Sequence, residues 1–215
     1  WGVGLAPTGD KDPYALRRHA LGICRLLLEK NLSLSLPELI EIARTQFTQK
    51  DVQEKAKTAD IYEFIIDRLR AYLREQSVAG KPFTSAEIEA VLSQSPKQIN
   101  DVIERLTALR EFNALPQATQ LAAANKRISN ILTKITGQKQ KFVQSALLKE
   151  PAEKDLYGML QKIEPQIYQI LQKQQYKEAL VILTNVKTVI DCFFLDVMVI
   201  CGDERLKNNR IALLY

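Results

Sequence analysis

The sequence predicts an all-α protein made of two helical bundles in tandem. Only eight Gly and eight Pro occur in 215 residues, and most stand where one apolar repeat ends and another begins. Between these breaks, apolar residues recur every three or four positions, which is the period of a helix. The composition, with 46% hydrophobic and 26% charged residues, is that of a folded chain and excludes disorder as the main state.

The first two helices are expected over residues 13–30 and 35–47. Asp12 and Pro13 open the first, because Asp accepts hydrogen bonds from free backbone N–H groups and Pro fits the first helical turn. Asn31 suits the left-handed position after it. The second begins at Ser35-Leu36-Pro37-Glu38, which has the spacing of a capping box.

Three more helices and one turn complete the first half. Residues 52–75 carry Ile61, Ile65 and Leu69 at helical spacing and predict one long helix. A turn follows at 78–82, and Thr84-Ser85-Ala86-Glu87 is a second capping-box sequence, before a short helix that ends near residue 94. Ser95-Pro96 is expected to open the fifth helix, which ends near residue 115.

Four helices are expected in the second half. The first covers 117–135 and stops at Gly137, and residues 138–150 form a basic connection. Pro151 starts the next helix, which Pro165 should kink or split. An apolar helix over 177–200 has a stripe too wide for a surface helix, so it should be the centre of the bundle. Asp203 is expected to cap a last helix that is still running at Tyr215.

The excess positive charge lies in the second half. Residues 1–115 hold 16 basic and 16 acidic residues, whereas residues 116–215 hold 14 and 9, which accounts for the net charge of +5. No acidic residue occurs from Phe112 to Lys149. An acid-free basic stretch favours a polyanionic partner, whether RNA, DNA or a membrane surface, and the alternative is a solvated helix face. The basic residues of this stretch are Lys126, Arg127, Lys134, Lys139, Lys141 and Lys149.

The sequence lacks the residues of a complete active site. His19 is the single histidine, so no nucleophile has an activating base, and we expect it to be a surface or packing residue. No Gly-rich phosphate-binding loop is present. Cys24, Cys192 and Cys201 have neither zinc-site nor disulfide-framework spacing and suit a reducing compartment. We therefore expect no catalytic residue, metal or cofactor in these 215 residues, and no apolar run is long enough for a membrane span.

Three stretches of the sequence carry a resemblance to a known family. They are Pro7–Arg18 with Ala20–Gly22 and Glu29–Leu32, then Leu121–Leu132, then Phe193–Asp203 with Leu206, Asn208 and Arg210–Leu214. In this order they resemble the C-terminal part of the beta subunit of the bacterial-type, two-subunit glycyl-tRNA synthetase. The third stretch is also similar to the helical anticodon-binding module of arginyl-tRNA synthetases. It departs from the family at Cys201-Gly202-Asp203, where an acidic pair is usual.

The resemblance implies a domain plan and a function. Residues 1–12 would leave a preceding HD-type domain, 13–115 would form a helical body, and 116–215 would form a C-terminally truncated anticodon-binding domain. The chain, which begins without Met, would be a piece of a longer protein. It would recognise glycine tRNA within a cytoplasmic ligase made of alpha and beta subunits, with no membrane partner. Glycine activation, ATP and Mg²⁺ would belong to the alpha subunit.

Nine polar residues are candidate tRNA contacts. Lys126, Asn130 and Lys134 share one helix face, where cations would follow a phosphate backbone and an amide would reach base edges. The alternative is that Arg127 and Asn130 tie their helix to its neighbours, and that Arg210 forms a structural salt bridge. The nine candidates are Asn125, Lys126, Arg127, Asn130, Lys134, Arg205, Lys207, Asn209 and Arg210.

Aromatic residues and two other functions stay open at this point. Phe142, Tyr157, Tyr168 and Tyr176 either stack on unpaired bases or belong to the core. The chain is otherwise a non-catalytic helical scaffold for subunit assembly, or a basic protein-binding module. The salt dependence of binding distinguishes these functions. Neutralising RNA phosphates releases counterions, so RNA binding should weaken steeply as the salt concentration rises, whereas binding through an apolar contact should not.

Overall fold

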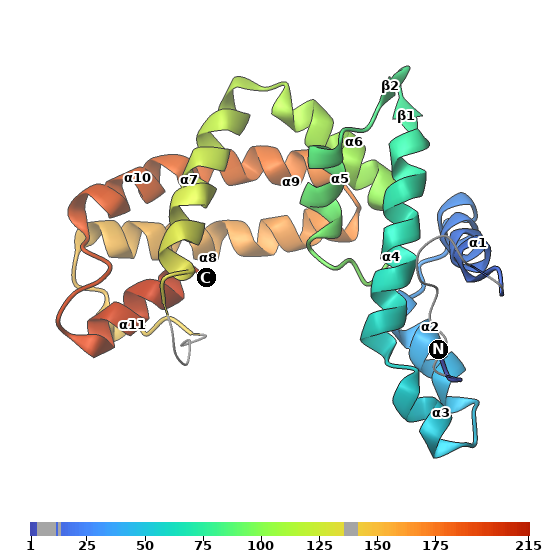
Figure 1. Ribbon diagram of the computed structural model, residues 1–215. Coiled ribbons are helices and arrows are strands. Elements are labelled where there is room, and N and C mark those ends of the chain that lie inside the picture. The colour runs from blue at the N-terminus through green and yellow to red at the C-terminus, as the bar shows by residue number, and fades with distance from the viewer. Residues whose placement is uncertain (4–11, 13, 136–141) are drawn as a thin grey trace. The chain divides into compact units, whose positions relative to one another are not determined.

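The computed structural model describes residues 1–3, 12, 14–135 and 142–215. Helices make up nearly all of the described secondary structure (Figure 1), so the predicted all-α class is confirmed. The chain divides into two compact units, Trp1–Thr107 and Ala108–Tyr215, and the helix α6 (Val102–Asn113) runs from one into the other. The domain plan drawn from the sequence, with its boundary at 115/116, stays a prediction. Among the described helices, none combines the length and apolar character that crossing a bilayer requires.

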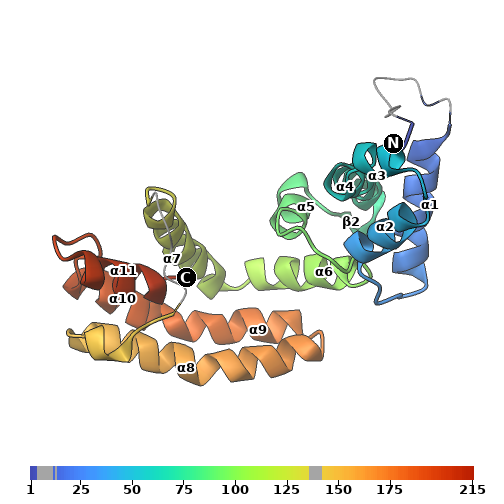
Figure 2. The same ribbon diagram turned by 90° about the horizontal axis from the view of Figure 1, so that it is seen from below.

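The first unit is built around the helix α4 (Thr58–Glu75), which packs against α1, α2 and α5. Its buried residues Ile66, Leu69 and Leu73 recur at three- and four-residue spacing and form one apolar face. In both views α1 and α2 lie beside α4 (Figure 1, Figure 2). The remaining elements are α1 (Leu16–Glu29), α2 (Leu36–Thr45), α3 (Lys50–Lys55), β1 (Ser77–Val78), β2 (Lys81–Pro82) and α5 (Ser85–Leu92).

The first helix begins later than predicted, at Leu16 with Ala15 as its N-cap residue, and Pro13 lies outside the described residues. Asp12 nevertheless bonds to the start of this helix, and the capping box predicted at Thr84 forms. The carboxylate of Asp12 accepts hydrogen bonds from the backbone N–H groups of Leu16 at 2.8 Å and Arg17 at 2.9 Å. The hydroxyl of Thr84 accepts from the N–H of Glu87 at 3.2 Å, and the Glu87 carboxylate accepts from the N–H of Thr84 at 2.7 Å. This reciprocal pair is the predicted capping box, and it opens α5.

The predicted turn at 78–82 is the tip of a small hairpin. Ser77 pairs with Pro82 and Val78 with Lys81 in an antiparallel register. Ala79 and Gly80 between them both have positive φ, 52° and 73°, as a tight primed turn requires. Asn31 also takes the left-handed conformation predicted for it, with φ of 47°.

The helix start predicted at Ser35 is confirmed, because α2 begins at Leu36 with Ser35 as its N-cap residue, but the capping box expected there does not form. The hydroxyl of Ser35 forms no cap and is buried without a partner among the described residues. The N–H of Leu36 donates instead to the carbonyl of Lys97 at 2.8 Å. The helix start predicted at Ser95 is wrong, because Ser95 is left-handed at φ of 48° and α6 starts only at Val102.

The single helix predicted over 52–75 is two helices. α3 ends at Lys55 and α4 begins at Thr58. Between them Ala56 (φ −85°, ψ 69°) and Lys57 (φ −67°, ψ 127°) leave the helical region. The hydroxyl of Thr58 donates to the carboxylate of Glu41 at 2.8 Å, which ties the start of α4 to α2.

The second unit is built around the helix α8 (Pro151–Gln172), which packs against α9, α10 and α11. α8 and α9 lie side by side in both views (Figure 1, Figure 2). Leu156, Phe193 and Ile211 are among the most deeply buried residues of its core. The other elements are α7 (Pro116–Leu132), the short 3-10 helices η1 (Ser145–Leu147) and η2 (Thr184–Val186), α9 (Tyr176–Leu183), α10 (Lys187–Asp196) and α11 (Glu204–Leu213).

Proline has one predicted and one unpredicted effect in α8. Pro151 opens the helix as expected, but Pro165 does not split it. Pro165 and Gln161 are both exposed, so water reaches the carbonyl group that Pro165 cannot bond. The helix therefore continues to Gln172 and remains long enough to serve the whole unit as a core element.

The apolar helix predicted over 177–200 is wrong in extent and in place. The segment is interrupted by η2, and it ends when Val197 becomes extended at φ −117° and ψ 119°. The centre of the unit is α8 instead. The predicted cap at Asp203 is confirmed, and α11 ends at Leu213 instead of running on. The predicted helix end at Gly137 and residues 138–141 of the basic connection lie outside the described residues.

Candidate nucleic-acid interface

The exposed face of α7 presents the predicted polar stripe. Lys126 and Asn130 lie four residues apart on this helix, and Lys134 lies in the turn that follows it. All three side chains are exposed, and none pairs with another side chain of the described residues. Four residues of a helix rise about 6 Å, which is the separation along the axis of α7 between Lys126 and Asn130. Exposed, unpaired cations in an acid-free segment are available to a polyanion.

Arg127 points to a different neighbour. Its guanidinium lies over the ring of Phe194 at 4.2 Å from the centroid, and its Nη2 donates to the carbonyl of Phe194 at 3.4 Å. This cation–π contact fastens α7 to α10. The predicted alternative of a tie between helices therefore fits Arg127, whereas it does not fit Asn130, whose side chain is exposed.

Asn125 lies at a pocket of about 470 Å³ in the second unit. The pocket is mainly apolar, with Leu121 and Ile128 from α7 and Leu180 from α9 in its wall, and Asn113 adds a second amide. Asn125 is exposed, so its amide group lies at the solvent-facing edge of the apolar pocket. Such a combination suits a flat ligand with both apolar faces and polar edges.

Two of the predicted contacts on α11 are turned inward. The side chain of Asn209 is buried and exchanges two hydrogen bonds with the backbone of Gln144: the Gln144 N–H donates to Oδ1 at 2.7 Å, and Nδ2 donates to the Gln144 carbonyl at 3.1 Å. Asn209 therefore holds the segment that leads from the basic connection into α8. Its polar atoms are occupied within the protein.

Arg210 forms a buried ion pair. Its Nε donates to Oε1 of Glu153 at 2.6 Å, and its Nη1 donates to the carbonyl of Met198 at 2.9 Å. The other carboxylate oxygen, Oε2 of Glu153, accepts from the backbone N–H groups of Lys149 at 2.6 Å and Glu150 at 2.8 Å. One carboxylate thus joins the start of α8 to α11 and to the chain between α10 and α11. The structural alternative for Arg210 fits this arrangement.

The electrostatics of that pair are consistent with its geometry. Burial by itself would raise the pKa of the Glu153 carboxyl, but the hydrogen bonds from Arg210 and from two backbone N–H groups outweigh burial and hold the pKa below its usual value. Burial would likewise lower the pKa of Arg210, and the Glu153 carboxylate raises it instead. Both groups are therefore charged in the folded protein at neutral pH.

The other polar residues of α11 remain at the surface. Arg205 is exposed, and Lys207 is half-buried with its Nζ 2.8 Å from the Glu204 carboxylate. The backbone N–H groups of Arg205 and Leu206 donate to Asp203 and hold the pKa of its carboxyl below the usual value. Arg205 is thus a clearer candidate for an external contact than Lys207, whose charge is already paired.

The predicted aromatic residues separate by exposure. Phe142 is 80% exposed and Tyr168 is 65% exposed, whereas Tyr157 and Tyr176 are half-buried. The hydroxyl of Tyr157 accepts a hydrogen bond from Gln161 on its own helix. Phe142 is the better placed ring for stacking, because it lies just before the Gln144 backbone that Asn209 clamps.

Sequence reasoning missed Glu153 and Gln144, the partners of the two inward residues. Each lies more than fifty positions from its partner, and no local pattern connects them. The one local sign was the Glu-Pro-Ala-Glu sequence at Glu150–Glu153, which forms a capping box in the structure. It indicates a helix start but not a buried charge.

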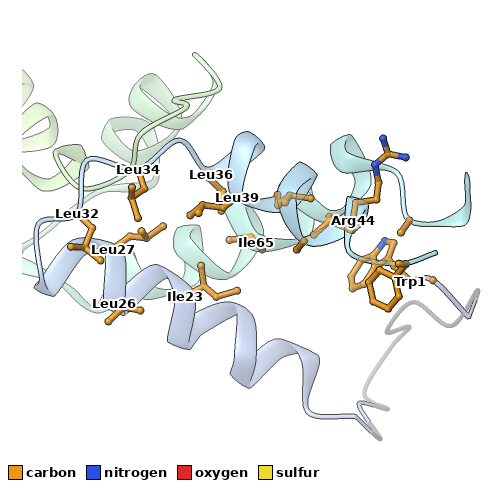
Figure 3. A pocket seen from close by; sticks show the side chains of 16 residues that line it. Trp1, Ile23, Leu26, Leu27, Leu32, Leu34, Leu36, Leu39, Arg44 and Ile65 are labelled. Carbon is orange, nitrogen blue, oxygen red and sulfur yellow. The ribbon is translucent and has the colours of Figure 1, made fainter. Parts of the chain in front are cut away.

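The first unit contains an apolar pocket without the groups of a catalytic site. Its volume is about 550 Å³, and Figure 3 shows Ile23 and Leu26 from α1 facing Leu36 and Leu39 from α2 across it. Among its lining residues the charged one is Arg44, which pairs with Glu41 at 2.5 Å. The described residues contain no cluster of three His, Cys, Asp or Glu side chains that would hold a metal ion.

The remaining titratable candidates also lack the setting of a catalytic site. His19 is exposed on α1. Cys24 is buried, and burial raises the pKa of its thiol to about 12, so it is not a nucleophile at neutral pH. Lys187 and Asp191 form an ion pair at 2.6 Å on one face of α10.

Two family models match the chain. Residues 1–93 match the model described as the glycyl-tRNA synthetase beta subunit, and residues 121–215 match the model described as the DALR anticodon binding domain. The second match contains α7 from residue 121 onward, all of α11 and the exposed lysines described above. Both matches agree with the two parts of the resemblance found in the sequence.

Similar proteins extend over the whole chain. The glycine–tRNA ligase beta subunit of Ralstonia nicotianae is 46% identical over 214 residues, which is 100% of this chain and 30% of that protein. Its counterparts in Dechloromonas aromatica and Shewanella piezotolerans are 44% and 42% identical, again over 100% of this chain and 29% and 30% of their own lengths. The chain therefore spans about 30% of the length of the relatives that it matches.

Proposed function

Because the chain is related over its whole length to part of the glycine–tRNA ligase beta subunits, we propose that it recognises tRNA within such a ligase, with anticodon contacts made by its second unit. The observation that carries the proposal is the match of residues 121–215 to an anticodon-binding domain, in which Lys126 on α7 and Lys134 in the turn after it are exposed and have no partner among the described residues. Those lysines supply the cationic surface that RNA binding requires.

The proposed contact surface consists of exposed residues and the half-buried Lys207. Lys126 and Lys134 neutralise phosphates, and Asn130 between them reaches a base edge. Asn125 and Arg205 extend the surface, Lys207 contributes where its pairing with Glu204 is exchanged for a phosphate, and Phe142 stacks on an unpaired base. Arg127, Asn209 and Arg210 act indirectly, by fixing α7, the segment at Gln144 and α11.

Glycine activation is assigned to the alpha subunit, together with ATP and Mg²⁺. The described residues of this chain do not fit those groups: they contain no carboxylate cluster for a metal, and the pocket of about 550 Å³ in the first unit is apolar. The proposed partners are therefore glycine tRNA and the alpha subunit, in a cytoplasmic hetero-oligomer. Charge on α7 and an apolar surface in the first unit are consistent with two such partners.

Nuclease protection tests the proposal. The 215-residue chain is expected to protect the anticodon loop of glycine tRNA, and the protection should fall steeply between 50 and 200 mM salt because released counterions drive binding. Lys57→Ala, which removes an exposed lysine of the first unit, is the matched control and should leave protection unchanged. Protection of the acceptor stem alone, or equal protection of tRNAs with any anticodon, would contradict anticodon recognition.

A second function, as a scaffold for subunit assembly, is favoured by the apolar pocket in Figure 3. Leu26 is 54% exposed and Phe47 is 51% exposed at its edge, and exposed apolar groups of this size mark protein contacts. Leu26→Glu should then abolish co-purification with the alpha subunit at any salt concentration. Tyr168→Glu, an equally exposed position of the second unit, should not.

A further inference from the structure

The first unit, although its charges balance in sequence, gathers arginines at one cleft. Arg17 and Arg18 from the first turn of α1 and Arg68 from α4 line a cleft of about 320 Å³. Leu21 and Ala71 add apolar wall between them. Water takes about 30 Å³ per molecule, so the cleft has room for a polyatomic anion with part of its hydration. Arg17 and Arg18 are also within the span that matches the beta-subunit model.

The cleft carries more positive than negative charge. Of its described lining residues, three are arginines and one is an acid, Glu75 at the end of α4. Arg18 is exposed and has no acidic partner among the described residues. The phenol of Tyr72 lies in the same wall and offers a further hydrogen-bond donor.

Arg68 gives the second, independent observation. Its Nε is buried, and no acceptor among the described residues receives its hydrogen bond. Its guanidinium lies 5.9 Å from the centroid of the Phe64 ring, which holds the side chain on the α4 side of the cleft. A buried donor of a charged group without an acceptor costs more than a neutral one, so an anion that accepts this bond would be favoured.

We propose that the cleft formed by Arg18 and Arg68 binds a phosphate group, carried by an RNA backbone or present as free phosphate. Guanidinium groups present forked donors that match phosphate oxygens, and two such groups line this cleft from the neighbouring helices α1 and α4. Asp12 already accepts the hydrogen bonds of the Leu16 and Arg17 N–H groups, so side chains and not the helix terminus hold the anion. The RNA alternative rests on the proposed function, while the anion site itself does not.

Two variants and one control test the site in the 215-residue chain. Arg18→Gln removes the exposed cation, and Arg68→Lys keeps charge and packing while removing the buried Nε, so neither is expected to unfold the protein. Arg74→Gln makes the same charge change as Arg18→Gln on the exposed side of α4, away from the cleft. Equal melting temperatures of all four proteins establish that folding is intact.

The first measurement is tRNA affinity against salt. If the cleft holds an RNA phosphate, Arg18→Gln and Arg68→Lys should each weaken binding about tenfold, the loss expected for one charged hydrogen bond. Arg18→Gln should also lower the slope of log affinity against log salt by about 0.7–0.9, whereas Arg68→Lys, which keeps the charge, should leave the slope nearly unchanged. Arg74→Gln should change neither. An equal effect of Arg74→Gln would overturn the site, because net charge alone would then explain the loss.

The second measurement is calorimetric titration with inorganic phosphate and with pyrophosphate. Heat of binding in the wild type that is lost in both cleft variants, with tRNA affinity unchanged, assigns the site to free phosphate. Unchanged tRNA affinity together with no phosphate binding overturns it. If the wild type does not bind tRNA at all, the proposed function fails. The phosphate titration alone then tests whether the cleft binds an anion.

Discussion

Arginine side chains in the two units form ion pairs that differ in their exposure to solvent. In the first unit Arg25 pairs with Glu29 at 2.7 Å and Arg70 with Glu89 at 2.6 Å, and the acids of these pairs are about half exposed. In the second unit Arg210 pairs with Glu153 at 2.6 Å, and the two side chains are 9% and 1% exposed. Nearly equal distances therefore conceal very different solvation. Surface pairs contribute little to stability, whereas breaking one partner of a buried pair leaves a desolvated charge.

The largest expected effect is the loss of that buried partner. Arg210→Ala should destabilise the second unit by about 3–5 kcal/mol, because Glu153 would remain buried without its counter-charge. Arg25→Ala should lower the free energy of unfolding far less, because solvent screens an exposed pair on a helix surface. Urea unfolding of both variants, followed by circular dichroism, measures the difference. Similar losses would show that burial does not distinguish the two units.

Lowering the pH should test the same difference between the buried ion pair and the surface ion pairs. The folded protein holds the pKa of Glu153 below the value of about 4.3 found in an unfolded chain. Its contribution to stability is therefore complete above the unfolded pKa and is lost as the pH falls through the folded pKa. Urea midpoints at pH 7, 5 and 3 should fall more steeply for the wild type than for Glu153→Gln. Parallel falls would mean that Glu153 is not the group responsible.

The sequence predicted those parts of the fold that depend on neighbouring residues. The capping box of Thr84 and Glu87 formed as expected, and so did the cap at Asp203. The box at Ser35 did not form, because the N–H of Leu36 bonds to Lys97 from a distant segment. Local spacing states which bonds a helix end is able to make, but it does not state which competing partner the fold brings near.

The candidate site divides in the same way. The four-residue spacing of Lys126 and Asn130 was enough to place them on one exposed face of α7. The direction of Asn209 and Arg210 was not readable, because Gln144 and Glu153 lie far away in sequence. Two polar residues on one short helix thus lie in opposite environments: Arg205 is exposed to solvent, and Arg210 is buried in the core.

A smaller effect is expected where the second unit reads RNA. Asn130→Ala should weaken binding of glycine tRNA by about 1–3 kcal/mol and affect a tRNA with another anticodon much less, because an amide at a base edge discriminates bases. Its side chain is exposed, so the melting temperature should not change. Fluorescence titration of both tRNAs with the wild type and the variant measures this. A lowered melting temperature together with equal losses of affinity for both tRNAs would indicate that Asn130 has a structural role instead.

The smallest expected effects are those of single phosphate contacts, and they test whether the charge difference between the units has a function. Lys126→Ala and Lys134→Ala should each weaken tRNA binding modestly while lowering the slope of log affinity against log salt by somewhat under one unit. Neither lysine has a partner among the described residues, so no ion pair is lost and the fold should be unaffected. Arg25→Gln is the control, since it removes the same charge from the first unit at a position already paired with Glu29. If all three substitutions lower the slope equally, net charge alone governs binding. If only the two lysines do, the phosphate contacts lie on α7, and the excess charge of the second unit serves RNA binding where it is exposed and unpaired.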